Sequence, residues 1–260
     1  MTFFGNSFEN QGVIRVATRI PILCLIVGFT FCVGVASAAE QPEDEFTIRS
    51  RKNLKQIALA FHNYHATYDK LPGFANFDSN RKPLLSWRVH LLPYIGDDAE
   101  KLYSEFHLNE PWSSEQNKKL IMRIPQIYSV PLDKPLKVGH TCYVVPRSVL
   151  TLFPQNENNN TWQLSFGEIH EGLGNIILTV EADHEAPVPW TKPADLQFDR
   201  SKPLSKLGHL REGGFLVSWA SGKISFIPNS LAADRADRTD FLRGLFERTG
   251  RGLAYYLNLK

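Results

Sequence analysis

Residues 50–72, SRKNLKQIALAFHNYHATYDKLP, contain the most regular helical pattern of the chain. Their apolar side chains recur every three or four residues, which places them on one face of an α-helix. This face comprises Leu54, Ile57, Ala58, Phe61, Tyr64, His65 and Tyr68. Thr47 or Ser50 can cap the amino end, and Leu71-Pro72-Gly73 ends the helix. The pattern predicts a long helix with one buried face.

Residues 1–38 have the pattern of a secretory signal peptide. Arg15 and Arg19 form a positive region, Ile20–Val35 is an apolar run, and Ala36-Ser37-Ala38 supplies the small side chains that signal peptidase requires. The apolar run is shorter than the roughly 20 residues that span a bilayer. We therefore expect a cleaved signal and export to the periplasm, the cell surface or the medium. Membrane attachment is expected only if the signal stays uncleaved.

The rest of the chain is predicted to form one domain. Residues 39–49 include the acidic, proline-containing run Glu40–Glu45 and are interpreted as a linker. Residues 50–260 are assigned to a single α+β domain, because helical patterns come first and β-type runs follow. Further helices are expected near 98–106, 114–123 and 239–248. The expected strands are Thr141–Val145, Trp162–Phe166, Ile176–Glu181, Phe215–Trp219 and Lys223–Ile227.

Charge and cysteine content exclude some classes of protein. The net charge is +2, and removal of residues 1–38 leaves +1, with both signs mixed along the chain. Nucleic-acid binding would need a concentrated basic face, so we expect no nucleic-acid partner. Cys142 is the one cysteine outside the signal. An exported chain would therefore contain no intramolecular disulfide.

His62 and His65 are the first candidates for chemistry. They lie one helical turn apart, and imidazole is a common zinc ligand. A zinc site needs a third protein ligand, and the nearby Asp69 and Asp78 show no recognisable zinc spacing. His65 also falls on the apolar face, where a histidine usually bonds to the backbone. We expect structural histidines here and assign no metal ion, cofactor or catalytic residue.

Glu181, Asp183 and His184 form a second candidate cluster, at the end of a predicted strand. Carboxylates beside an imidazole can divide acid and base roles in a hydrolase, and carboxylates also bind calcium. An exposed polar loop explains the same residues, since Pro187-Val188-Pro189 follows directly. The sequence leaves a hydrolase-type enzyme, and a metal site at Asp183 and His184, open as alternatives.

The tryptophans are a third candidate feature. Trp87, Trp112 and Trp190 could form a platform on which a sugar ring packs, or they could fill the core. A sugar- or solute-binding module is therefore another alternative.

Several sequence blocks in one order carry a resemblance to a known family. The longest are Asn53–His65, Leu85–Tyr94, Leu102–Trp112, Glu171–Ile177 and Val188–Leu196. The chain resembles a large bacterial family, abundant in planctomycetes, of exported, pilin-related proteins of unknown function. Members of this family are labelled by a sequence motif that consists of a histidine, nine further residues and then Asp-Gly. The resemblance implies a pilin-like fold, in which an amino-terminal helix packs on an antiparallel sheet with extra short helices.

The chain departs from this family in two places. Val33 occupies the glutamate position of the prepilin processing site, and the apolar run ends within a few residues. Ser221 stands where aspartate is expected, and eleven residues separate it from His209. The first departure implies a soluble relative, a monomer without the apolar stem that builds a pilus core.

Together these observations predict an exported, non-enzymatic envelope or surface protein with a structural or binding role. Its expected partner is a cell-envelope protein or a glycan. The hydrolase using Glu181, Asp183 and His184 and the tryptophan-based binding module are the alternatives.

Overall fold

The computed structural model describes residues 43–155, 161–185, 187–232 and 236–248. The expected signal peptide and residues 39–42 of the expected linker lie outside these ranges. The described residues belong to one compact unit. Within it, helices and antiparallel strands are both present, which confirms the predicted α+β class.

The predicted amino-terminal helix is confirmed as α1, Glu45–Tyr68, although it starts earlier than expected. Asp44 is the capping residue, because its side chain accepts the backbone N–H of Thr47. The expectation of a cap at Thr47 or Ser50, and of a linker reaching residue 49, was therefore wrong. Asp69 ends the helix in a left-handed conformation, and its N–H donates to the carbonyl of His65.

Four strands form the main sheet, in the order β10-β9-β6-β4, and all neighbours are antiparallel. Their bounds are β4 Tyr143–Val144, β6 Ile177–Glu181, β9 Gly214–Trp219 and β10 Ile224–Pro228. The predicted hairpin of β9 and β10 is confirmed. It turns at Ser221-Gly222, where Gly222 has a φ of 79° that a glycine adopts without strain.

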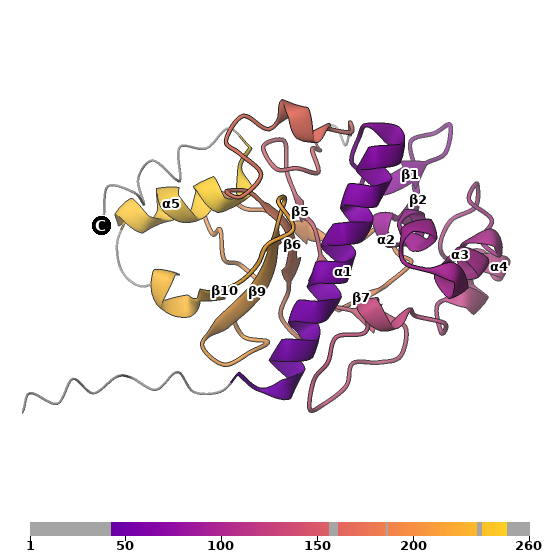
Figure 1. The fold of residues 1–260 in the computed structure, drawn as a ribbon. Coiled ribbons are helices and arrows are strands. Elements are labelled where there is room, and N and C mark those ends of the chain that lie inside the picture. Colours follow the sequence, from indigo (N-terminus) through magenta and orange to yellow (C-terminus); the bar gives the residue numbers. More distant parts are fainter. Residues whose placement is uncertain (1–42, 156–160, 186, 233–235, 249–260) are drawn as a thin grey trace, which may run out of the picture. The chain divides into compact units, whose positions relative to one another are not determined.

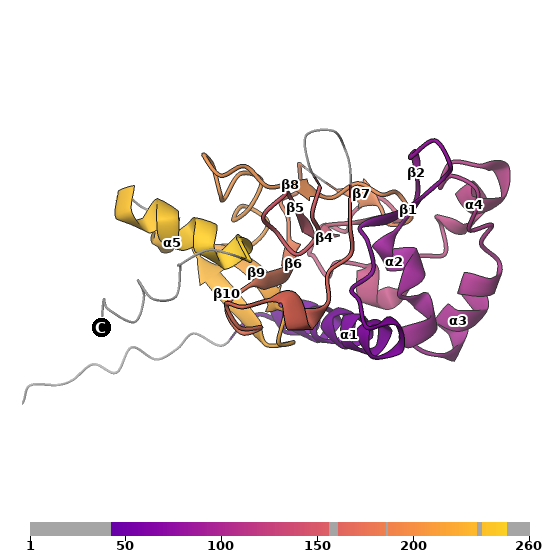
Figure 2. The same ribbon diagram turned by 90° about the horizontal axis from the view of Figure 1, so that it is seen from above.

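Side chains on successive positions of the sheet enter two different cores. Leu178 and Leu216 pack in the core that includes Leu54 and Phe61 of α1. The alternate residues pack with α5, Ala236–Phe246, in the second core. The sheet is therefore covered by α1 on one face and by α5 on the other (Figures 1 and 2).

Short helices and two-stranded ribbons occupy the other side of α1 (Figure 1). The segment between α1 and the main sheet contains β1 Ala75–Phe77, β2 Pro83–Ser86, α2 Trp87–His90, η1 Leu92–Tyr94, α3 Asp97–Ser104, α4 Glu115–Leu120 and η2 Gln126–Tyr128. The helices expected near 98–106 and 114–123 are thus confirmed as α3 and α4. The cap of α4 is Ser114.

Smaller elements complete the described chain. They are β3 His140–Thr141, β5 Pro146–Arg147, η3 Phe166–Glu168, β7 Val188–Pro189, β8 Leu196–Gln197 and η4 Asn229–Ala232. Within the part of the chain that the structure describes, no helix is both long enough and apolar enough to cross a membrane.

The strand expected at Trp162–Phe166 is absent from this described segment. Ser165 instead starts the 3-10 turn η3, where its side chain and that of Glu168 form a reciprocal capping box. Local side-chain bonds to the backbone replaced the cross-strand bonds that a strand would need.

Candidate functional site

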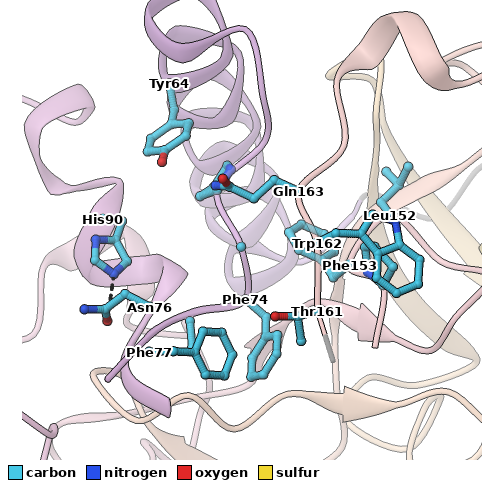
Figure 3. Close-up of a pocket in the computed structure, with 14 residues that line it drawn as sticks. Tyr64, Phe74, Asn76, Phe77, His90, Leu152, Phe153, Thr161, Trp162 and Gln163 are labelled. Carbon is cyan, nitrogen blue, oxygen red and sulfur yellow. Dashed lines mark hydrogen bonds between the residues drawn. The ribbon is translucent and has the colours of Figure 1, made fainter. Parts of the chain in front are cut away.

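A pocket of about 340 Å³ lies beside the carboxyl end of α1 (Figure 3). Its volume falls at the lower end of the range of about 300–1,000 Å³ typical of small-molecule sites. The lining comes from α1, from the segment that follows it, from α2 and from two stretches after β5. The lining residues are Tyr64, Pro72, Gly73, Phe74, Ala75, Asn76, Phe77, His90, Leu152, Phe153, Pro154, Thr161, Trp162 and Gln163.

Aromatic side chains form two walls of the pocket (Figure 3). Phe74 and Phe77 meet edge to face, with ring centroids 5.6 Å apart and planes at 80°. Trp162 lies opposite them and keeps 39% of its surface exposed. The guanidinium of Arg147, outside the pocket lining, lies 3.4 Å from the Phe74 ring centroid. This cation–π contact holds Phe74 in place.

His90 and Asn76 form a polar edge of the pocket. Their hydrogen bonds show which ring nitrogen of His90 carries the hydrogen. Asn76 Oδ1 accepts the N–H of Leu85, and its Nδ2 donates to the carbonyl of Leu108. His90 Nε2 lies 3.1 Å from the same Oδ1, so Nε2 carries the hydrogen and donates. Burial lowers the pKa of His90 to about 4. His90 is therefore neutral near pH 7.

Tyr64, Gln163 and Thr161 add polar groups on other sides of the pocket (Figure 3). Gln163 Nε2 donates to the carbonyl of Leu71 at 3.0 Å, which fixes its amide beneath the end of α1. Burial raises the pKa of Tyr64, so its hydroxyl stays protonated. The lining contains no Asp, Glu, Lys or Arg among the described residues. The pocket can bind an uncharged molecule with one apolar side and several hydroxyl or amide groups.

His62 and His65 come together on one side of η3, where both rings stack on Phe166 with centroids 4.7 and 4.5 Å away. Nε2 of His65 accepts the N–H of Phe166 at 3.0 Å, so this lone pair is already used. Burial lowers the pKa of His62. Across the described residues, no group of three or more possible metal-ligating side chains occurs.

Glu181, Asp183 and His184, the second candidate cluster, have different partners and different burial. Glu181 is fully buried; Arg211 donates to both of its oxygens, at 2.5 and 2.7 Å, and Ser50 donates to one of them. Asp183 is 4% exposed and accepts the backbone N–H groups of His209 and Leu210.

The imidazole that pairs with Asp183 is His209, with Nδ1 and Oδ2 2.9 Å apart. His184 is exposed, and among the described contacts none joins it to either carboxylate. None of Glu181, Asp183 and His184 lines the pocket.

The tryptophans chosen from the sequence are mainly core residues. Trp87 and Trp190 are fully buried, and Trp190 donates from Nε1 to the carbonyl of Ile121. Trp112 is half-buried, and the ammonium of Lys192 lies 5.3 Å from its ring centroid. Trp87 and Trp190 therefore fill the core, which is one of the two roles that the sequence left open for them. Trp162, which does line the pocket, was interpreted as part of a strand.

Sequence reasoning also missed Asn76 and His90. The aromatic pair of Phe74 and Phe77 just after a helix end was a usable signal, because apolar rings in a turn-rich segment need a packing partner. Nothing in the sequence showed that residues 152–154 and 161–163 provide that partner, since about 80 residues separate them from Phe74 and Phe77.

Comparison with known proteins gives one finding about family. No curated protein and no solved structure matches the chain. Residues 48–132 match the family model described as "Protein of unknown function (DUF1559)". This segment runs from the first turns of α1 to just beyond η2, and it includes Tyr64, Asn76 and His90 of the pocket. Over these residues the chain is therefore similar to a protein family of unknown function.

Proposed function

We propose that this chain is an exported, non-enzymatic binding protein of the cell envelope, and that its aromatic pocket binds a neutral sugar unit. The residues of the amino-terminal signal pattern support export. The sequence resemblance supports a pilin-related origin, a planctomycete source and, with the missing apolar stem, a monomer.

The observation that carries the proposal is the composition of the pocket. A pyranose ring has apolar C–H faces that pack on aromatic rings, and hydroxyl groups around its edge. The half-buried Phe77 and the exposed Trp162 provide rings, while Thr161 and Gln163 provide polar groups. The absence of charged side chains from the described lining disfavours anionic or cationic solutes, because such ligands would be desolvated without a counter-charge.

The hydrolase alternative has less support. A general acid or base must reach the substrate, yet the oxygens of Glu181 are occupied by Arg211 and Ser50, and those of Asp183 by His209 and Leu210. Both carboxylates hold the fold together instead.

Isothermal titration calorimetry of the full chain against a panel of neutral mono- and oligosaccharides tests the proposal. At least one sugar is expected to bind with one-to-one stoichiometry. Trp162→Ala should weaken that binding on the order of tenfold or more, because a partly exposed aromatic ring in a pocket is a typical energetic centre of binding. A charged analogue such as the corresponding uronic acid should bind less tightly.

Met122→Ala is the matched control. Met122 is 63% exposed and does not line the pocket, so its loss removes a comparable exposed apolar side chain. Its affinity for the sugar should equal that of the wild type. A panel without any binding, or equal losses in the two variants, would contradict the proposal.

A further inference from the structure

A second groove lies beside the amino-terminal half of α1. Its volume is about 410 Å³, and it runs between one face of α1 and the segment that contains η2. The lining residues are Phe46, Arg49, Lys52, Asn53, Gln56, Gln126, Ile127, Ser129, Val130, Pro131, Leu132 and Pro135. Arg49, Lys52, Asn53 and Gln56 follow the spacing of a single helical stripe, so one wall is a continuous polar face of α1.

Two cations without a counter-charge lie on this wall. Arg49 and Lys52 are exposed and one turn apart, and no described residue forms an ion pair or hydrogen bond with either side chain. Glu45 lies one turn before Arg49 and does not pair with it. The lining itself contains no Asp or Glu. The groove therefore has a positive rim, in contrast to the uncharged pocket at the other end of α1.

The opposite wall is apolar and is fixed to the helix. Asn53 Nδ2 donates to the carbonyl of Ser129 at 3.1 Å and reaches that of Gln126 at 3.4 Å. Arg211 Nη2 donates to the carbonyl of Pro131 at 3.4 Å. These bonds, together with two prolines in the wall, hold the groove open before any partner binds, which lowers the entropic cost of binding.

The chemistry of the two walls selects the kind of occupant. In an extended peptide, successive side chains point to opposite sides. A peptide with alternating acidic and apolar residues can therefore place carboxylates on Arg49 and Lys52 and apolar groups on Leu132 and Pro135. A nucleic acid is a poorer fit, because two cations and one phenylalanine do not form the basic track with stacking aromatics that single strands need.

We propose that this groove binds an extended acidic segment of a partner protein, with Arg49 and Lys52 pairing with its carboxylates. The site is separate from the sugar pocket, so this inference does not depend on the function proposed above.

Fluorescence anisotropy of the full chain tests this with labelled octapeptides of alternating Glu and Val, alternating Gln and Val, and alternating Lys and Val. The Glu peptide is expected to bind best, and its affinity should fall as the salt concentration rises. The double variant Arg49→Gln, Lys52→Gln should weaken binding of the Glu peptide on the order of tenfold at low ionic strength.

The matched control is Lys118→Gln, Lys119→Gln, which removes the same charge from α4, outside the groove. It should bind the Glu peptide as the wild type does. Equal binding of the Gln peptide, equal loss in the control, or no binding of the Glu peptide at millimolar concentration would overturn the proposal. Competition by heparin that is unaffected by the Arg49 and Lys52 changes would show a general polyanion surface instead.

Discussion

His62 and His65 show how one helical turn gives two histidines different surroundings. Both stack on Phe166. Nε2 of His65 accepts a backbone N–H, whereas Nε2 of His62 is buried without a hydrogen-bond partner among the described residues. Both rings therefore act as packing surfaces for η3. The bond from the Phe166 N–H is a backbone contact of the kind expected for a histidine on the apolar face of the helix.

His65→Ala should lower the free energy of unfolding by about 2 kcal/mol, because it leaves the N–H of Phe166 unpaired and removes a stacked ring. Urea denaturation followed by circular dichroism measures this. Asn63→Ala, on the exposed face of the same helix, should change stability by less than about 0.5 kcal/mol. Equal effects of the two changes would show that the contact with Phe166 does not stabilise the fold.

The pair of Asp183 and His209 predicts a dependence of stability on pH. The hydrogen bond and charge of Asp183 raise the pKa of His209 above its usual 6.5. A raised folded-state pKa stabilises the fold below pH 6.5, and this contribution is lost as the pH rises through the higher, folded-state pKa. His209→Gln should therefore destabilise the protein more at pH 5.5 than at pH 8.5.

Urea denaturation at the two pH values measures that difference, and an NMR titration of the His209 ring checks the pKa directly. His184→Gln serves as the control, because His184 is exposed and, within the described part of the chain, forms no bond with Asp183. A pH-independent effect of His209→Gln would contradict the assigned pair. A pH-dependent effect of His184→Gln would instead indicate that His184, the histidine of the cluster predicted from the sequence, pairs with Asp183.

Among the elements, α1 and β6 are joined by a buried polar network. Glu181 at the end of β6 binds Arg211 and Ser50, and the Ser50 hydroxyl lies 2.6 Å from that of Tyr143. Arg211 Nη1 also donates to Thr47 in the first turns of α1. Because each of these groups has a partner, the network fixes the position of the helix on the sheet without leaving a buried charge unpaired.

Arg211→Met should cost about 3–5 kcal/mol of stability, because it leaves the carboxylate of Glu181 buried and unpaired. The double variant Arg211→Met, Glu181→Leu should recover part of this loss, since no charge then remains in the core. A double-mutant cycle in urea measures the coupling. The exposed pair provides the comparison: Arg51→Met, opposite Glu43, should cost less than about 1 kcal/mol.

Periodic elements could be predicted from the sequence, and contacts between distant segments could not. The apolar face of α1 and the hairpin of β9 and β10 have local patterns, and both were found where expected. The cap at Asp44 was missed because Thr47 and Ser50 are equally good capping residues by type. Instead, the Thr47 hydroxyl accepts a hydrogen bond from Arg211, and the Ser50 hydroxyl donates one to Glu181. Both partners are more than 130 residues away.

The candidate site was harder to predict for the same reason. Trp87 and Trp190 were plausible platform residues by type, but burial depends on neighbours such as Tyr128, whose ring stacks on Trp190 at 5.9 Å. Trp162 had no periodic pattern to mark it as a pocket residue.

At the scale of the whole molecule, α1 connects two sites of different character. The groove uses residues 46–56 of the helix and the pocket uses Tyr64 near its carboxyl end. The rise of 1.5 Å per residue places Arg49 and Tyr64 roughly 22 Å apart. Neither set of lining residues contains a member of the other. A neutral ligand and an acidic segment could therefore occupy the molecule together.

We expect the two ligands to bind independently. Each, at ten times its dissociation constant, should add about 1.4 kcal/mol of stability, which corresponds to a rise in Tm of roughly 3–5 °C for a domain of this size. The two rises should add when both ligands are present. Differential scanning fluorimetry with the best-binding sugar and the alternating Glu and Val peptide measures this.

Independence follows from the packing of α1, because Leu54, Ile57 and Phe61 between the two sites are fully buried. Such a helix has no alternative position to which one ligand could shift it, and coupling requires an element with two arrangements. The affinity for the peptide should therefore change by less than about twofold when the sugar is saturating. A larger change would mean that α1, or the loop from η2 to Pro135, moves between two positions, and Ile57→Ala should then alter the size of the coupling.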